Sequence, residues 1–153
     1  MLPGGTDISN WDAKRVIGHL DLQPHPEGGH FRETWRDEAT GGGRGHGTAI
    51  YYLLAAGELS AWHRVDAAEI WHWYAGGPLA LTLSPNGHDA SAIHLGQQLD
   101  MGQQPQAIVP PNCWQTAESL GMWTLVGCTV SPAFEFSGFE MAPKGWFPKP
   151  RQR

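Results

Sequence analysis

The stretch Gly57–Gly76 reads GELSAWHRVDAAEIWHWYAG and contains two short runs that are typical of β-strands. We predict strands over Ser60–Val65 and Glu69–Tyr74, because aromatic and β-branched residues recur in these runs. Side chains alternate between the two faces of a strand. One face of this pair then carries His63, Val65, Glu69, Trp71 and Trp73. An imidazole and a carboxylate among aromatic rings are the composition of a small-molecule pocket.

Similar short runs continue on both sides of this stretch. The further predicted strands are His30–Arg36, Thr48–Ala55, Leu79–Leu83, Ala92–Leu95, Gln106–Val109, Cys113–Ala117, Met122–Val130 and Ser137–Met141. Turn signals such as Gly76-Gly77-Pro78 and Pro85-Asn86-Gly87 separate most of them. Short strands at this spacing predict an all-β fold, an antiparallel sandwich or barrel.

One amphipathic helix is predicted before the strands, over about residues 10–22. Apolar residues recur there at helical spacing, namely Ala13, Val16, Ile17 and Leu20. Ser9 or Asn10 can cap the helix, because a short polar side chain accepts hydrogen bonds from the free amides of the first turn. Pro24 cannot continue it.

Strand alternation extends the predicted pocket to other strands. Phe31, Glu33 and Trp35 share one face of the first strand, and Gln115 lies on the inward face of the strand Cys113–Ala117. The complete predicted interior set is Phe31, Glu33, Trp35, His63, Val65, Glu69, Trp71, Trp73 and Gln115. This set has apolar walls and a few polar groups that converge, as a ligand pocket requires.

Length and composition limit the classes of protein. The chain has 153 residues, which favours one domain, and its 41% hydrophobic and 16% charged residues exclude disorder. No apolar run is long enough to span a membrane. The net charge is −5, and the basic, proline-rich tail at 143–153 leaves the rest still more acidic, which argues against nucleic acid as a partner. Without a leader-like start, we expect a cytoplasmic protein with Cys113 and Cys128 reduced.

The same central stretch resembles the first cupin motif, which reads Gly, five residues, His-x-His, three or four residues, Glu, six residues, Gly. Gly57, His63, Glu69 and Gly76 match its spacing, whereas Val65 replaces the second histidine. The segment Pro110-Pro111-Asn112-Cys113-Trp114-Gln115 is similar to the second motif, with Gln115 where a histidine would stand. The resemblance implies a double-stranded β-helix barrel over about residues 29–142 of a single domain, 1–153.

The segment Pro24-His25-Pro26-Glu27-Gly28-Gly29-His30-Phe31-Arg32-Glu33-Thr34 narrows the resemblance to a family of small cupins of unknown function. That family implies a homodimer and no established reaction. The segment is also similar to cupin nucleotide-sugar epimerases. This likeness implies that Arg32 and Glu33 contact a sugar nucleotide and that His63 is a general base. The tyrosines stand at 51, 52 and 74, so the late tyrosine proposed as the acid in those enzymes is absent.

Three functional hypotheses follow from these residues. In the first, a metal-independent pocket binds a sugar or nucleotide-sugar and transfers protons, with His63 as base and Glu69 orienting it. A desolvated Glu33 would serve as an acid or bind ligand, Gln115, Phe31 and Arg32 would contact ligand, and Trp71 and Trp73 would stack on it or form ordinary core. The second hypothesis is a divalent-metal oxygenase or isomerase that uses His63, Glu69 and Gln115, although glutamine is a poor ligand and no cofactor is the stronger expectation. The third is a binding module without catalysis.

Overall fold

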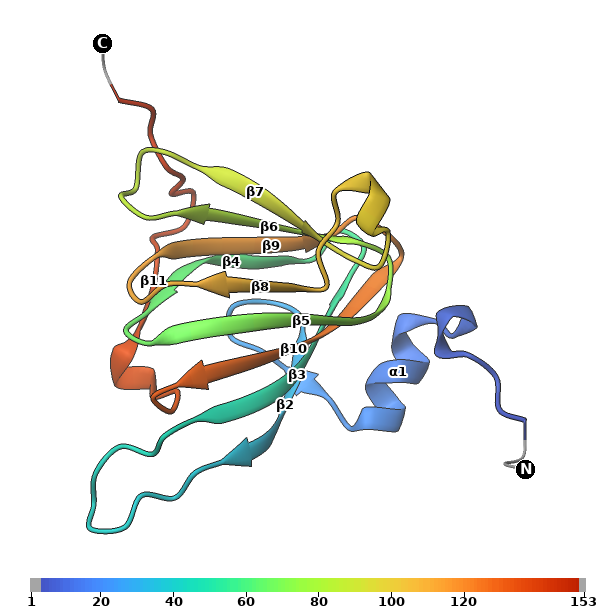
Figure 1. The fold of residues 1–153 in the computed structure, drawn as a ribbon, viewed down its shortest axis with the longest axis horizontal. Coiled ribbons are helices and arrows are strands. Elements are labelled where there is room, and N and C mark those ends of the chain that lie inside the picture. The colour runs from blue at the N-terminus through green and yellow to red at the C-terminus, as the bar shows by residue number, and fades with distance from the viewer. Residues whose placement is uncertain (1–3, 152–153) are drawn as a thin grey trace.

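Two antiparallel sheets face each other in the computed structural model, which describes residues 4–151 (Figure 1). The larger sheet has the strand order β1 (Gln23–Pro24), β2 (His30–Arg36), β3 (Thr48–Ala55), β10 (Trp123–Ser131), β5 (Ala68–Gly76) and β8 (Gln106–Val109). The smaller sheet has the order β11 (Phe139–Met141), β4 (Leu59–Val65), β9 (Trp114–Ser119), β6 (Leu79–Ser84) and β7 (Ser91–Leu95). The predicted all-β, cupin-like double-stranded β-helix is therefore confirmed.

Each predicted strand corresponds to an observed one, with ends that differ by at most two residues. The strand β1 was not predicted, because it has only two residues, and the last strand begins two residues later than predicted. Residues Phe136–Gly138 form the 3-10 turn η3 there, and β11 begins only at Phe139. Two other 3-10 turns, η1 (Ile8–Asn10) and η2 (Leu99–Met101), lie outside the sheets.

The helix α1 (Ala13–Leu20) is shorter than predicted and has a different cap. The carboxylate of Asp12 accepts from the backbone N–H of Arg15 at 2.8 Å, so Asp12 takes the role expected of Ser9 or Asn10. Asp21 ends the helix in the left-handed conformation. The helix packs against the outside of the larger sheet, where Val16 is buried with Leu53, Trp123 and Leu125.

The main core lies between the sheets. It combines Leu79, Leu81 and Leu83 of β6 with aromatic and aliphatic side chains of the larger sheet, such as Tyr52 and Trp71. Burial of this apolar surface is the dominant stabilising term for a domain of this size. The interior is filled at this end, which leaves space for a ligand only toward the opposite end of the sheets.

Bulges interrupt the strict alternation of two strands that form the site. The β2–β3 register shifts between Glu33 and Trp35, so Trp35 is 53% exposed and its predicted interior position is wrong. The β4–β9 register shifts between Ser60 and His63, and both of these side chains point inward. An extra residue on one strand reverses the faces beyond it, and the sequence does not show where that residue is inserted.

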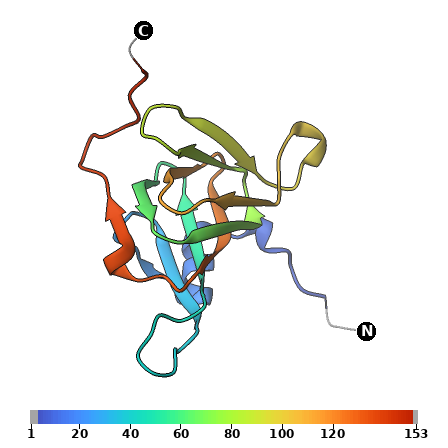
Figure 2. The same cartoon turned by 60° about the vertical axis from the view of Figure 1, so that its left-hand side comes forward.

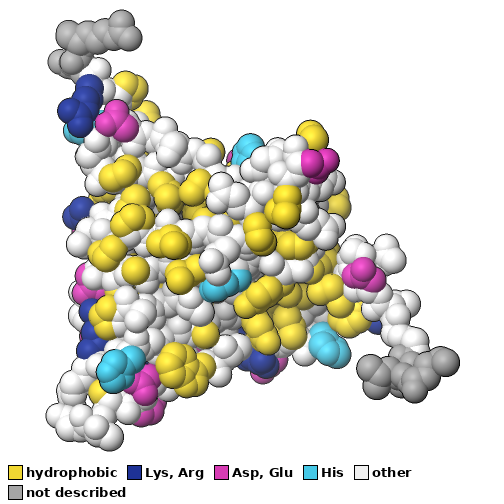
Figure 3. All heavy atoms as spheres, in the orientation of Figure 1, with side chains coloured by type: hydrophobic (Ala, Val, Ile, Leu, Met, Phe, Trp, Pro, Cys, Tyr) yellow, Lys and Arg dark blue, Asp and Glu magenta, His cyan; other side chains and the backbone are white. Residues whose placement is uncertain are grey.

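The outer surface has few charged groups over one broad face (Figure 3). Among the exposed apolar residues are Tyr74 of β5 and Ile108 of β8, 50% and 60% exposed. Figure 2 shows that the loop between β2 and β3 projects away from the two sheets. Within residues 4–151, no helix has the length and apolar character needed to cross a membrane. Cys113 and Cys128 are both free and buried.

Candidate functional site

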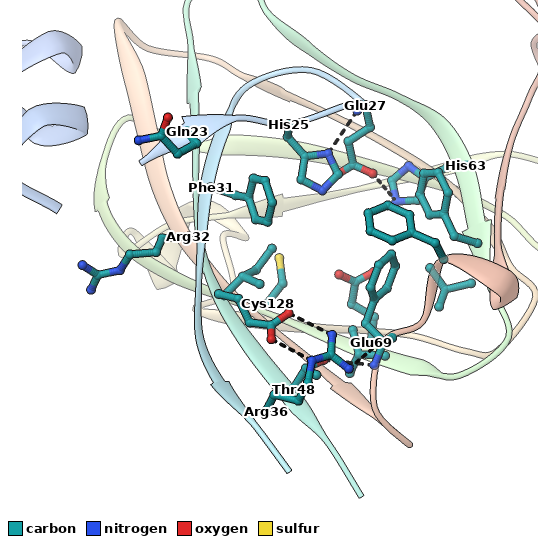
Figure 4. Close-up of a pocket in the computed structure, with 17 residues that line it drawn as sticks. Gln23, His25, Glu27, Phe31, Arg32, Arg36, Thr48, His63, Glu69 and Cys128 are labelled. Atoms are coloured by element: carbon teal, nitrogen blue, oxygen red, sulfur yellow. Dashed lines mark hydrogen bonds and ion pairs between the residues drawn. The ribbon is translucent and has the colours of Figure 1, made fainter. Parts of the chain in front are cut away.

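A cavity of about 440 Å³ opens between the two sheets (Figure 4). Phenylalanines supply much of its apolar lining: Phe31 of β2, and Phe134, Phe136 and Phe139 from the segment that includes η3 and β11. Its buried polar lining includes His25, Glu27, Thr48, His63 and Glu69. The volume lies within the range of small-molecule sites, and the few polar groups converge as such sites require.

The tight loop His25–Gly29 places Glu27 at the cavity. The backbone N–H of His25 donates to the carbonyl of Gly29 at 2.9 Å, and the Glu27 carbonyl accepts from Ala61 of β4 at 2.8 Å. Gly28 and Gly29 have positive φ angles of 111° and 76°. A Cβ on Gly28 would collide with the Leu59 carbonyl oxygen, so only glycine allows the loop to approach β4 this closely.

Both ring nitrogens of His63 have partners in the protein. Nδ1 lies 2.7 Å from the Ala61 carbonyl oxygen, and Nε2 lies 3.1 Å from Oε2 of Glu27. A carbonyl oxygen can only accept, so Nδ1 carries a hydrogen. In a neutral ring Nε2 then carries no hydrogen, so it faces Oε2 of Glu27 as an acceptor.

Burial decides whether the proton of the Glu27–His63 pair resides on the carboxyl or on the imidazole. Desolvation raises the pKa of Glu27 and lowers the pKa of His63, because both charged forms lose contact with water. Both shifts favour a protonated carboxyl that donates to a neutral imidazole. The neutral form of the Glu27–His63 pair, with the proton on Glu27, is therefore favoured over the ion pair.

Glu69 is a second buried carboxyl in the same cavity. Its Oε1 accepts from Nε2 of Gln115 at 2.8 Å, and Oε1 of Gln115 in turn accepts from Nε1 of Trp71 at 2.9 Å. Burial, the largest cause, raises the pKa of Glu69 to about 7. A group with this pKa exchanges protons readily at neutral pH, as a general base must.

His25 contributes a second imidazole. Its Nδ1 accepts from the backbone N–H of Glu27 at 3.0 Å, and the ring packs edge-on against Phe31 with centroids 4.5 Å apart. Its Nδ1 also lies 3.9 Å from Oε1 of Glu27, which is too long for a hydrogen bond. Desolvation lowers the pKa of His25, so we treat the ring as neutral rather than as an ion-pair partner.

An ion pair borders the mouth of the cavity. The guanidinium of Arg36 binds Glu33 through two bonds, at 2.8 and 2.9 Å, and donates to the Phe134 carbonyl at 2.9 Å. Arg32 also lies at the rim, but Figure 4 shows it directed away from the cavity, and its guanidinium sits 5.5 Å from the Tyr51 ring centroid. The positive charge of Arg36 is already matched by Glu33.

The structure brings only part of the predicted set to the cavity surface. Phe31, His63 and Glu69 line it. Glu33 also borders the cavity, where it is the exposed partner of Arg36. It is not the desolvated acid that was predicted, because the interior of the cavity lies deeper than this residue. The carboxyl that approaches His63 Nε2 most closely is that of Glu27, whereas Glu69 interacts with His63 through its charge.

Three other predicted ligand contacts lie behind the cavity wall. Trp71 is 1% exposed in the core, and Gln115 is 0% exposed with both ends of its amide engaged. Trp73 packs at the edge of the core, where its Nε1 donates to the Gly77 carbonyl at 3.0 Å. Gln115 and Trp71 thus support Glu69, and neither tryptophan lines this cavity.

The conditional metal set His63, Glu69 and Gln115 does not fit a cation. The Gln115 oxygen is used by Trp71, and both His63 nitrogens are occupied. Within residues 4–151, no group of three or more histidine, cysteine or acidic side chains is arranged to hold a metal ion. We therefore derive no step through a metal.

Sequence reasoning missed Glu27 and His25. Both lie in the loop His25–Gly29, and a loop has no strand alternation from which to infer where its side chains point. The available signal was the pair of glycines after Glu27, which indicates close backbone packing.

Comparisons with known proteins agree with the fold. A family model described as the Cupin superfamily (DUF985) matches residues 14–142. A solved protein from Shewanella oneidensis is 37% identical with a TM-score of 0.80, over 86% of this chain and 84% of that one. A hypothetical protein from Leishmania major is 27% identical with a TM-score of 0.78, over 88% and 89% of the two chains.

More distant likeness concerns the fold alone. Oxalate decarboxylase from Bacillus subtilis is 12% identical with a TM-score of 0.58, over 80% of this chain and 30% of that one. No curated protein matches the chain.

Proposed function

The chain belongs to the Cupin superfamily (DUF985) family, and we propose that its cavity binds a small sugar-like carbonyl compound and transfers protons at the carbon beside the carbonyl. The observation that carries this proposal is a buried base and a stored proton in one cavity. Glu69 supplies the base, and the Glu27–His63 pair supplies the proton.

The roles follow from which atoms are free. His63 uses both nitrogens within the protein, so it acts through Glu27 and does not take a proton from the ligand directly. Glu69 is held by Gln115 at one oxygen only, and its carboxylate lines the cavity. Glu69 is therefore the better candidate base, and its pKa of about 7 suits it to accept a proton at neutral pH.

The proposed step balances without another reactant. The Glu69 carboxylate takes the proton from the carbon beside the carbonyl, and the C–H electron pair forms the double bond of an enediol. The former carbonyl oxygen takes the proton held by the Glu27–His63 pair. Glu69 then returns its proton to either carbon while an enediol hydroxyl returns a proton to the Glu27–His63 pair. This gives an isomerised or epimerised product and restores the Glu69 carboxylate and the proton on the pair.

The lining of the cavity interior favours binding of an uncharged sugar group over binding of a phosphate. The cavity interior holds two carboxyls, and the nearby guanidinium of Arg36 is already paired with Glu33. A phosphate taken into this interior would lose its water without gaining a free cation. In a nucleotide-sugar, the phosphates would remain at the rim, beside Arg32.

Solvent deuterium exchange tests the proposal. The protein is incubated in heavy water with ketoses and keto-sugar nucleotides that raise its melting temperature, and NMR follows loss of the signal beside the carbonyl. We expect exchange that depends on the protein and falls about a hundredfold in Glu69→Gln. Exchange that is unchanged in this variant contradicts the role of Glu69. Binding without any exchange contradicts proton transfer and supports a binding module.

A further inference from the structure

The second imidazole of the cavity has a fixed orientation of donor and acceptor. Nδ1 of His25 accepts the backbone N–H of Glu27 at 3.0 Å, so Nδ1 carries no hydrogen while this bond exists. A neutral imidazole has one hydrogen, which must then be on Nε2. The loop backbone thus sets the tautomer.

Packing fixes the direction of this ring. His25 lies edge-on against Phe31 and 5.5 Å from Tyr52, measured between centroids, and its side chain is 8% exposed. Figure 4 shows the ring at the edge of the cavity with its second nitrogen directed inward. Among residues 4–151, no side chain or backbone oxygen accepts a hydrogen bond from Nε2.

We infer that His25 is the donor that binds the carbonyl oxygen of the ligand, and that the site selects uncharged hydroxy-carbonyl compounds. This inference rests on the proposed function and names its substrate class. A neutral N–H donor faces a cavity whose other deep polar groups include a carboxyl and a carboxyl–imidazole pair. A compound with a carbonyl oxygen and hydroxyl groups can satisfy both kinds of partner.

The alternatives fit the same groups less well. A carboxylate or phosphate would lie beside Glu69, whose ionised form repels another negative charge. A protonated amine would meet the His25 donor without an acceptor there. A simple alcohol would accept from His25, but it lacks the polarised oxygen that benefits from the bond as an enediol forms.

Two substitutions distinguish the acceptor role of Nδ1 of His25 from the donor role of Nε2. Asparagine places its side-chain oxygen near the position of Nδ1 and can accept the Glu27 N–H, but it lacks the inward donor. Glutamine places an N–H₂ near the position of Nε2 and loses the acceptor. His25→Asn should therefore retain the loop and lose the ligand contact, whereas His25→Gln should do the reverse.

The binding test uses dihydroxyacetone, with glycerol as the partner that lacks the carbonyl. Ligand-observed NMR titration gives both dissociation constants. We expect the wild-type protein to prefer dihydroxyacetone, His25→Asn to lose about tenfold in that preference, and His25→Gln to keep most of it. An unchanged preference in His25→Asn overturns the inference, as does a wild-type protein that binds neither compound or binds both equally.

A second measurement does not depend on any ligand. Nitrogen-15 NMR of the imidazoles should show a hydrogen on Nε2 of His25 and none on Nδ1 at neutral pH. A hydrogen on Nδ1 overturns the assignment. Preference for dihydroxyacetone without deuterium exchange would support His25 as the carbonyl donor and contradict the proposed proton transfer, so the two proposals fail separately.

Discussion

Nε2 of His63 lies 3.1 Å from Oε2 of Glu27, although the two residues belong to different structural units, a glycine-rich loop and the strand β4. The Ala61 carbonyl holds the hydrogen of the opposite ring nitrogen. The histidine therefore faces the carboxyl with an acceptor, and the carboxyl must supply the proton. A histidine–acid pair of this kind needs no metal to hold its tautomer.

Replacing Glu27 with glutamine should remove the carboxyl proton and preserve the shape of the side chain. The glutamine amide can still donate to Nε2 of His63, so the melting temperature should change little. Deuterium exchange should fall about a hundredfold, because the enediol oxygen loses its proton source. Glu140→Gln is the matched control, since Glu140 is exposed and pairs with Arg64 outside the cavity. Equal loss of exchange in both variants would refute a specific role for Glu27.

The pKa of Glu69 makes stability depend on pH in a definite direction. The folded pKa of about 7 lies above 4.5, the ordinary pKa of a glutamate side chain, so the folded chain binds more protons between these values. The free energy of unfolding contributed by Glu69 then falls as the pH rises from about 4.5 to 7, by about 3 kcal/mol in total.

Glu69→Gln isolates this contribution, because its amide oxygen can still accept from Gln115. The variant should gain stability relative to the wild type as the pH rises through this window, and the difference should level off above about pH 8. The difference between variant and wild type is needed because the lowered pKa values of His25 and His63 have the opposite effect. They reduce stability as the pH falls below 6.5, the ordinary pKa of histidine. Urea unfolding at several pH values measures the difference in unfolding free energy between the variant and the wild type. A difference that does not vary with pH rules out a buried, titrating Glu69.

Gly28 should tolerate no side chain. A Cβ at this position would collide with the Leu59 carbonyl oxygen, so the loop must move and carry Glu27 with it. We expect Gly28→Ala to cost roughly 2 kcal/mol or more of unfolding free energy. Gly42→Ala is the control, because Gly42 also has a positive φ, of 81°, but nothing lies within 4 Å of its added Cβ. Similar costs for the two variants would show that backbone strain alone acts, without the close approach to β4.

Chelation should leave binding and exchange unchanged. The groups that a metal would need are already engaged, Gln115 with Trp71 and Glu69, and His63 with Glu27 and Ala61. Exchange is measured before and after treatment with a chelator, on protein prepared without a histidine tag. Loss of exchange that zinc, manganese or iron restores would contradict a metal-independent reaction.

Strand alternation predicted the fold and part of the site. Phe31 and Glu69 lie on regular stretches of strand, and His63 shares its face with Val65 on the part of β4 that follows the bulge, so their inward direction follows from a period of two residues. Trp35 follows a bulge in β2, and its predicted face was reversed for that reason. Gln115 does point inward, but its burial behind Glu69 depends on packing between sheets, which a single strand pattern does not contain.

Strand alternation could not predict the positions of Glu27 and His25, because both lie in a loop. Glu27 and His25 reach the cavity because Gly28 and Gly29 fold the chain back against β4 and β3. That path depends on contacts with residues about thirty positions away in the sequence. Local patterns indicate a turn there, but they do not indicate which side chains it carries inward.

The proposed proton transfer depends on a proton that Glu27 holds beside a neutral His63. Infrared difference spectroscopy between the wild type and Glu27→Gln at pH 7 measures this most directly. We expect the wild-type spectrum to contain the carbonyl stretch of a protonated, buried carboxyl, and the spectrum of Glu27→Gln to lack it. Carboxylate bands together with an imidazolium signal from His63 would contradict it.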